Sequence, residues 1–220
     1  DDCFIFLSDR LPLEDYTSIL LRFHQLQCDG VINVKRVKNP EYYGVTVLEE
    51  KGAFIKQIVE KPREFISDLA VAGAYLFGKT MTPRLFELLE EQSKLPLENG
   101  EEHQLTPVIE QLIRENVKIT INEMREEILD FGRPEGLLEG NKHLLSELKL
   151  NDPTYEELVQ SKNIIDSKII PPVYIGENAN ITDSVIGPYV SIGDNVSIQK
   201  CILKEAVIGD GATLKKIISS

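Results

Sequence analysis

A hexapeptide repeat in the C-terminal part of the sequence restricts what this chain can fold into more than any other feature. Its units begin with an aliphatic residue followed by glycine, their fifth position is small or branched, and the clearest start at Ile175, Ile186, Ile192 and Ile208. This register is typical of a β-helix, in which each short strand forms one side of a triangular coil. At about 18 residues per coil, residues 173–220 give fewer than three coils, and we expect the last coil to need a partner or more chain.

The residues before the repeat alternate short apolar runs with segments of helical periodicity. Cys3–Leu7 is an uninterrupted apolar run, typical of a strand buried on both faces, and Leu13–Gln27 has apolar residues at helical spacing. Further strands are predicted at Val31–Val37, within Gly44–Glu60, at Ala70–Phe77 and at Val117–Asn122, and further helices at Pro83–Gln92, Thr106–Asn116 and Pro134–Leu148. This order predicts an α/β fold with a mixed, mostly parallel sheet, in which ligands bind beyond the carboxyl ends of strands.

The change of pattern along the chain predicts three parts. Helical spacing ends before Pro171-Pro172, a stiff pair that precedes the repeat. We therefore expect an α/β domain over residues 1–150, a linker over 151–172 and a β-helix over 173–220.

Composition excludes several classes of protein. The chain has 36 acidic and 24 basic residues, a formal charge of −12, which opposes binding to nucleic acid or to anionic membranes. The longest apolar run, Ala70–Phe77, is too short to span a membrane. Three widely separated cysteines suggest neither a disulfide framework nor a zinc site. We expect a soluble cytoplasmic protein. If its acidic domain handles phosphates, it should do so with a few placed cations and a metal ion rather than with a broad basic field.

Two aspartates are candidate metal ligands. Asp9 and Asp130 each follow a short apolar run, so the fold could bring both to one sheet edge. Two carboxylates suit Mg²⁺, which takes a few protein oxygens and completes its shell with water and substrate phosphates. An aspartate that closes a strand is, on its own, more often a turn or helix cap.

A charged pair and a glycine are candidate ligand contacts. Glu60 and Lys61 are adjacent strand positions and so point to opposite faces, unless Pro62 turns the chain. A charged strand end in solvent is the simpler interpretation. Gly73 lies in a predicted buried strand and permits close approach, either of a ligand or of packed backbone.

Six motifs, taken in order, resemble the sugar-1-phosphate nucleotidyltransferases, and the glucose-1-phosphate thymidylyltransferase-like members most of all. They are Phe6–Asp9, Asn39–Val45, Val59–Pro62, Ala70–Tyr75, Glu102–Thr106 and Leu129–Asn141. The resemblance spans residues 1 to about 148, and the repeat is similar to the left-handed β-helix of many long members. Residues 1–150 would then be the sugar-phosphate half of a nucleotidyltransferase domain.

The resemblance implies a reaction and a role for each candidate. An oxygen of a sugar 1-phosphate, glucose 1-phosphate being the expected substrate, attacks the α-phosphorus of a nucleoside triphosphate and releases pyrophosphate. Sugar-pocket residues would be Tyr43, Gly44, Glu60, Gly73 and Tyr75, with Glu60 and the Gly44 backbone on the sugar hydroxyls. The catalytic set would be Lys61 on the sugar phosphate and Asp9 and Asp130 holding Mg²⁺.

Departures from the family pattern shape the remaining expectations. No glycine-rich triphosphate loop occurs in the sequence, so we expect a fragment that is inactive alone and whose complete form binds a nucleoside triphosphate. We expect the repeat region to drive self-association, because fewer than three coils leave an open β-helix end. Arg10 stands where the family commonly has Asn. One alternative is a non-catalytic, pyrophosphorylase-like assembly or sensing subunit. Acyl transfer by the β-helix is a weaker one, because residues 173–220 contain no histidine as a general base.

Overall fold

The computed structural model describes residues 1–50, 52–97, 103–153, 155 and 163–219, so Glu102 of the fifth motif lies outside the described residues. Contacts divide the chain into two compact units, Asp1–Ile128 and Leu129–Ser220. We describe each unit by itself.

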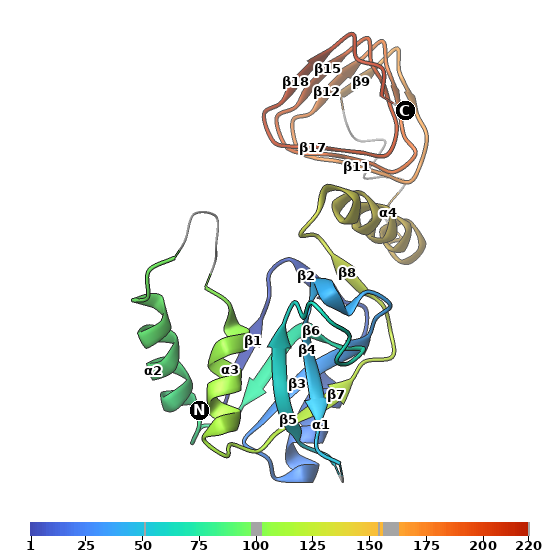
Figure 1. The fold of residues 1–220 in the computed structure, drawn as a ribbon. Helices are drawn as coiled ribbons and strands as arrows, with labels where there is room; N and C mark the ends of the chain where they lie inside the picture. Colours follow the sequence, from blue (N-terminus) through green and yellow to red (C-terminus); the bar gives the residue numbers. More distant parts are fainter. Residues whose placement is uncertain (51, 98–102, 154, 156–162, 220) are drawn as a thin grey trace. The chain divides into compact units, whose positions relative to one another are not determined.

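The first unit is built on a mixed sheet whose strand order is β5-β4-β6-β3-β7, with β1 added along β6 (Figure 1). Its strands are β1 (Cys3–Phe6), β3 (Gly30–Arg36), β4 (Gly44–Leu48), β5 (Ile55–Glu60), β6 (Leu69–Phe77) and β7 (Ile119–Glu123). Strand β6 is buried at every position, as its continuous apolar sequence predicts for a central strand covered on both faces.

The mixed sheet is confirmed, but parallel pairing does not dominate it. Among the described pairings of this sheet only β3–β7 is parallel, whereas β6 runs antiparallel to β1, β3 and β4, and β5 runs antiparallel to β4. An uninterrupted apolar run reports burial on two faces and carries no information on strand direction. The prediction of a mostly parallel sheet therefore overstated what the sequence pattern contains.

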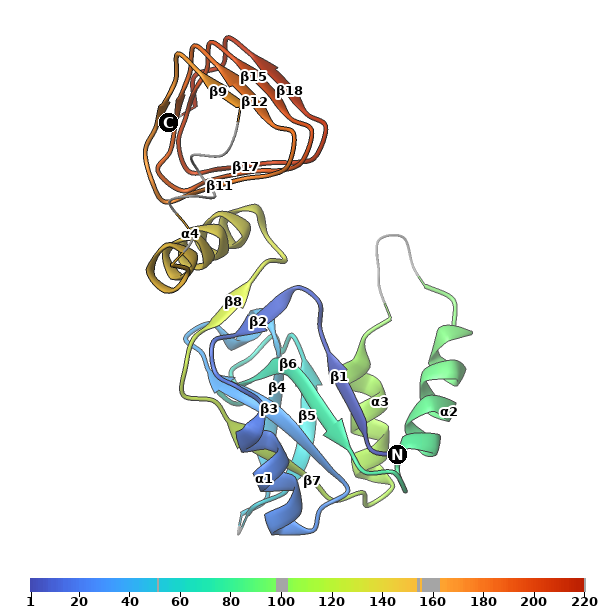
Figure 2. The same cartoon turned by 180° about the vertical axis from the view of Figure 1, so that it is seen from behind.

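Helices cover both faces of the sheet, with α1 (Thr17–Leu26) on one face and α2 (Thr82–Ser93) and α3 (Leu105–Arg114) on the other (Figure 2). Strand β3 alternates accordingly: Ile32 packs with α2 and α3, while Val31 packs with α1. No described helix is both long and apolar enough to cross a membrane.

Helix α1 begins later than its periodicity predicts. Residues Arg10–Pro12 form the short strand β2 instead of leading directly into the helix. The Asp15 carboxylate accepts a hydrogen bond of 2.8 Å from the backbone N–H of Thr17 and so satisfies one of the free donors at the helix start.

The second unit contains helix α4 (Pro134–Asn151) followed by a parallel β-solenoid, which the repeat predicts. The solenoid has about three turns, whereas the hexapeptide count over residues 173–220 predicts fewer than three. Its three sheets have the strand orders β10-β13-β16, β11-β14-β17 and β18-β15-β12-β9. The strands are β9 (Asn163–Ile165), β10 (Lys168–Ile169), β11 (Val173–Ile175), β12 (Asn180–Thr182), β13 (Val185–Ile186), β14 (Val190–Ile192), β15 (Ser197–Gln199), β16 (Ile202–Leu203), β17 (Ala206–Ile208) and β18 (Thr213–Lys215). Aliphatic side chains stacked from turn to turn fill the interior.

Two strands occupy a segment predicted to be linker. β9 and β10 precede Pro171-Pro172, and β9 pairs in register with β12, Asn163 opposite Asn180. The hexapeptide pattern, an aliphatic residue followed by glycine, does not occur in this first turn, so the sequence pattern did not assign it to the solenoid. Burial of Ile164 against the solenoid interior is enough to place the strand.

Helix α4 packs on the solenoid. Asn141 accepts a hydrogen bond of 2.5 Å from the Ser191 hydroxyl and donates one of 3.2 Å to the Tyr189 carbonyl. Lys142 forms an ion pair of 2.5 Å with Glu205, which lowers the pKa of that carboxyl. Residues 134–148, where the family resemblance ends, thus contact the repeat.

Candidate functional site

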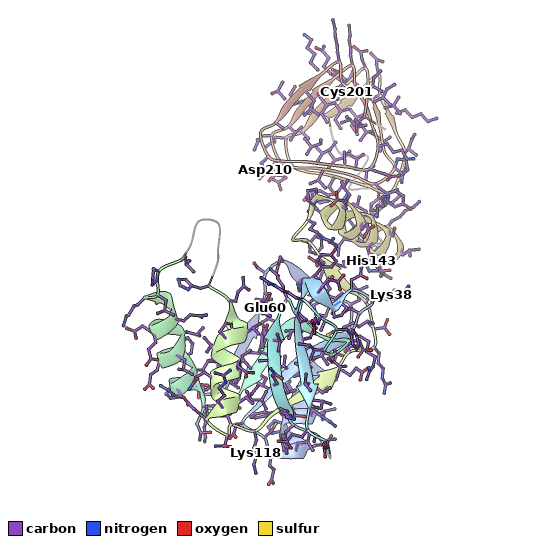
Figure 3. All side chains as sticks on the ribbon, in the orientation of Figure 1. Lys38, Glu60, Lys118, His143, Cys201 and Asp210 are labelled. Atoms are coloured by element: carbon purple, nitrogen blue, oxygen red, sulfur yellow. The ribbon has the colours of Figure 1, made fainter. Side chains whose placement is uncertain are left out.

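Gly44 and Glu60 lie directly opposite each other on β4 and β5. The Glu60 Oε2 atom accepts a hydrogen bond of 2.6 Å from the Thr106 hydroxyl in the first turn of α3, and Figure 3 labels Glu60. A Cβ atom on Gly44 would come within 3.0 Å of both oxygens. Two predicted site residues therefore meet, and the absence of a side chain at Gly44 leaves room for this contact.

Arg10 lies against the same part of the unit. Its guanidinium carbon is 4.9 Å from the centroid of the Tyr43 ring, a cation–π distance. The Tyr43 carbonyl in turn accepts a hydrogen bond of 3.0 Å from the Lys61 backbone. Tyr43 therefore links the start of β2 to the residue that follows β5.

Gly73 is the point at which β1 and the following turn approach β6. Its φ of 84° is in the left-handed region that favours glycine, and its carbonyl accepts a hydrogen bond of 2.8 Å from the Leu7 N–H. A Cβ atom there would lie 3.1 Å from the Arg10 Cδ atom. The close approach predicted at Gly73 is thus made by the chain itself.

Tyr75 is only 3% exposed. Burial raises the pKa of its phenol, the negative charge of Glu60 raises it further, and the positive charge of Arg10 acts in the opposite direction. These three side chains are therefore close enough to influence one another, and Tyr75 stays a neutral hydroxyl at any physiological pH.

Lys61 does not continue the extended backbone of β5, in which neighbouring side chains point to opposite faces of the sheet. Its φ of 42° ends β5 in a left-handed conformation, and the following Pro62 is buried. Because the pleat is broken at this residue, Glu60 and Lys61 need not point to opposite faces. The exposed Lys61 side chain is available to a ligand beside Glu60.

The two candidate metal ligands lie in different units. Asp9 is exposed in the turn between β1 and β2, directly before Arg10. Asp130 ends β8 (Ile128–Asp130), where its Oδ1 atom accepts a hydrogen bond of 3.1 Å from the Gly132 N–H. The described residues contain no group of three or more His, Cys, Asp or Glu side chains placed to hold a metal. Their pairing around a metal therefore stays a prediction.

Sequence reasoning gave no role to two residues of this cluster, Arg10 and Thr106. Arg10 stood out only as a departure from the family pattern, and Thr106 only as part of a motif. Both become visible through contacts between segments far apart in the chain, namely Arg10 with Tyr43 and Thr106 with Glu60.

A separate cavity of about 560 Å³ lies near the start of α1, lined by Glu14, Asp15, Ser18, Asn122, Glu123 and Arg125. Its carboxylates already serve the fold: Glu14 accepts from the backbone N–H groups of Arg125 and Glu126, and Asp15 accepts from Thr17. No sequence motif pointed to it.

Comparison with known proteins matches the two halves of the chain to two families. The sequence model of the nucleotidyl transferase family matches residues 1–147, and that of the GlmU-like C-terminal hexapeptide matches residues 155–215. The second match also begins before Pro171, in agreement with the early start of the solenoid.

Two curated relatives and one solved structure are similar to the chain. The bifunctional protein GlmU of Methanocaldococcus jannaschii is 34% identical over 148 residues, which are 67% of this chain and 33% of that protein. The mannose-1-phosphate guanylyltransferase catalytic subunit beta of Danio rerio is 30% identical over 169 residues, 76% and 42% of the two chains. A Bacillus anthracis structure described as a glucose-1-phosphate thymidylyltransferase has a TM-score of 0.50 and 24% sequence identity. The match covers 64% of this chain and 53% of that one.

The matched residues thus span about a third of the first of these relatives and about two fifths of the second. The likeness to the Bacillus anthracis structure, below a quarter identity, concerns the fold alone.

Proposed function

The chain belongs to the nucleotidyl transferase family, and we propose that its first unit forms the sugar-1-phosphate side of a site for nucleotidyl transfer. In this reaction an oxygen of the sugar 1-phosphate attacks the α-phosphorus of a nucleoside triphosphate. The bond between that phosphorus and the bridging oxygen to the β-phosphate breaks, and pyrophosphate leaves. Catalysis then consists of positioning and charge neutralisation.

The observation that carries this proposal is the contact of Gly44 with Glu60 on neighbouring strands, directly before Lys61. The Glu60 carboxylate accepts hydrogen bonds from sugar hydroxyls, and the Tyr75 phenol is a neutral donor. Lys61 supplies a point charge for the phosphate. Glucose 1-phosphate is the substrate we propose first, and the relatives that act on mannose 1-phosphate make it the natural competitor.

Asp9 and Asp130 complete the proposal as ligands of a divalent metal. Asp9 fits this role because its carboxylate is exposed one residue from Arg10, which lies against Gly73 and the Tyr43 ring. Oxygen donors suit Mg²⁺, which when bound neutralises charge on the phosphates. The residues that would hold it are Asp9 and Asp130.

Calorimetry with sugar 1-phosphates tests the assignment of Glu60 and Lys61. Lys61→Ala should weaken glucose 1-phosphate binding by about 10-fold or more, since a charge-assisted contact to phosphate contributes about 1.5–3 kcal/mol. Glu60→Ala should instead reduce the discrimination among glucose, galactose and mannose 1-phosphates, because it removes a contact to hydroxyls.

Lys56 is the matched control, an exposed lysine on the same strand as Glu60. Lys56→Ala should bind like the unaltered chain. Equal affinities for all three sugar phosphates across every variant would contradict the assignment.

A further inference from the structure

We propose that Thr106 is a positioning residue that fixes the Glu60 carboxylate for selection among sugar hydroxyls. This inference rests on the proposed function, because it gives Glu60 the role of sugar ligand. Thr106 itself touches no substrate; it acts through the orientation of Glu60.

The first support is the hydrogen bond itself. The Thr106 hydroxyl donates to Glu60 Oε2 over 2.6 Å, within the short range of O–H bonds to carboxylates. Thr106 is only 7% exposed, so water competes weakly for its hydroxyl. Within the part of the chain that the structure describes, Oε1 accepts no hydrogen bond, so one carboxylate oxygen is held while the other is available.

The second support is the position of the contact in the fold. Thr106 is the second residue of α3, so Glu60 lies at the N-terminal end of this helix. The partial positive charge of a helix N-terminus favours a carboxylate there. The helix N-terminus and the Thr106 hydroxyl therefore both stabilise this position of the Glu60 carboxylate. Without them the Glu60 side chain, with its three rotatable bonds, would sample several rotamers.

The third support is Gly44, which closes the arrangement from the opposite strand. A side chain there would meet both Glu60 Oε2 and Thr106 Oγ1 at 3.0 Å. Residues from β4, β5 and α3 thus determine one orientation of the carboxylate. Loss of the Thr106 hydroxyl should free it while leaving Lys61 and its charge in place.

The test compares binding of glucose 1-phosphate, galactose 1-phosphate and inorganic phosphate by calorimetry. Thr106→Val keeps the shape of the side chain and removes the donor. We expect about a 10-fold loss of affinity for glucose 1-phosphate and a smaller preference over galactose 1-phosphate, with inorganic phosphate unaffected. Thr106→Ser keeps the hydroxyl and should bind like the unaltered chain, whereas Thr106→Ala lacks it and should bind like the valine variant. The serine and alanine variants therefore test the role of the hydroxyl even if Thr106→Val does not fold.

Thr46 supplies the matched control. It is fully buried in the same unit, but its hydroxyl donates to the Leu69 carbonyl over 3.3 Å. Thr46→Val should leave the sugar preference unchanged. An equal loss in Thr46→Val, or an unchanged preference in Thr106→Val, would overturn the inference while leaving the proposed function intact. Absence of any sugar-phosphate binding by the unaltered chain would instead contradict the proposed function, and the inference with it.

Discussion

Glu60 and Lys61 illustrate how one backbone angle decides what two neighbouring charges can do. In a regular strand they would face opposite sides of the sheet. The left-handed conformation of Lys61 breaks that rule at the last residue before Pro62. A sequence can suggest such a turn through its proline, but the angle itself depends on the Tyr43 carbonyl, which receives the Lys61 N–H.

Asp9 and Asp130 give the prediction for the metal site. Asp9→Asn and Asp130→Asn should each reduce turnover by orders of magnitude in a protein that carries the complete site, because each removes a negative charge that would hold the cation near the phosphates. The measurement is Mg²⁺-dependent release of pyrophosphate, with circular dichroism to show that the fold is retained. Near-normal turnover in either variant would remove that residue from the metal site.

The candidate site could be predicted only in part from the sequence. Gly44, Glu60, Gly73 and Tyr75 belong to motifs, and the structure brings Gly44 into contact with Glu60. The contacts of Thr106 with Glu60 and of Arg10 with Tyr43 join residues 46 and 33 positions apart, which no local pattern reports.

In the solenoid, aspartate side chains connect successive turns. Asp194 Oδ1 accepts a hydrogen bond of 2.7 Å from the Glu177 N–H, and Asp210 Oδ1 accepts one of 2.9 Å from the Asp194 N–H. The glycine of a hexapeptide lies against the aspartate of the next turn: Gly176 against Asp194, and Gly193 against Asp210. The aspartate carboxylate that follows the hexapeptide glycine thus accepts a hydrogen bond from a backbone N–H of the neighbouring turn.

This ladder predicts different effects for two equivalent glycines. A Cβ atom at Gly193 would lie 2.8 Å from the Asp210 backbone nitrogen, so Gly193→Ala should destabilise the solenoid by about 1–3 kcal/mol. Gly209 has nothing within 4 Å of the same position, and Gly209→Ala should change stability by only a few tenths of a kcal/mol. Urea denaturation followed by circular dichroism measures both, and an equal loss in the two variants would contradict the ladder.

The order of strands and helices was easier to predict than their pairing. Hydrophobic period and composition predicted the positions of most elements, because the pattern of apolar residues shows whether one or both faces are buried. The same pattern did not predict strand direction in the first unit, where β6 runs antiparallel to both β1 and β3. The first solenoid turn had a signal that the glycine criterion missed: Asn163-Ile164 stands 17 residues before its partner Asn180-Ile181.

At the level of the molecule, the chain joins a unit that matches nucleotidyl transferases to a unit that matches the GlmU-like hexapeptide domain. Self-association through the solenoid stays a prediction, as does the approach of Asp130 to Asp9. The proposed sugar-phosphate pocket is independent of both, because Gly44, Glu60, Lys61 and Tyr75 all belong to the first unit.

A crystal structure of the chain with glucose 1-phosphate tests this pocket most directly. We predict that the sugar hydroxyls contact Glu60 and the Gly44 backbone, that the phosphate lies beside Lys61, and that the Thr106–Glu60 bond is retained. Ligand bound in the cavity between Glu14 and Arg125, or on the solenoid, with the Glu60 carboxylate untouched, would contradict the account.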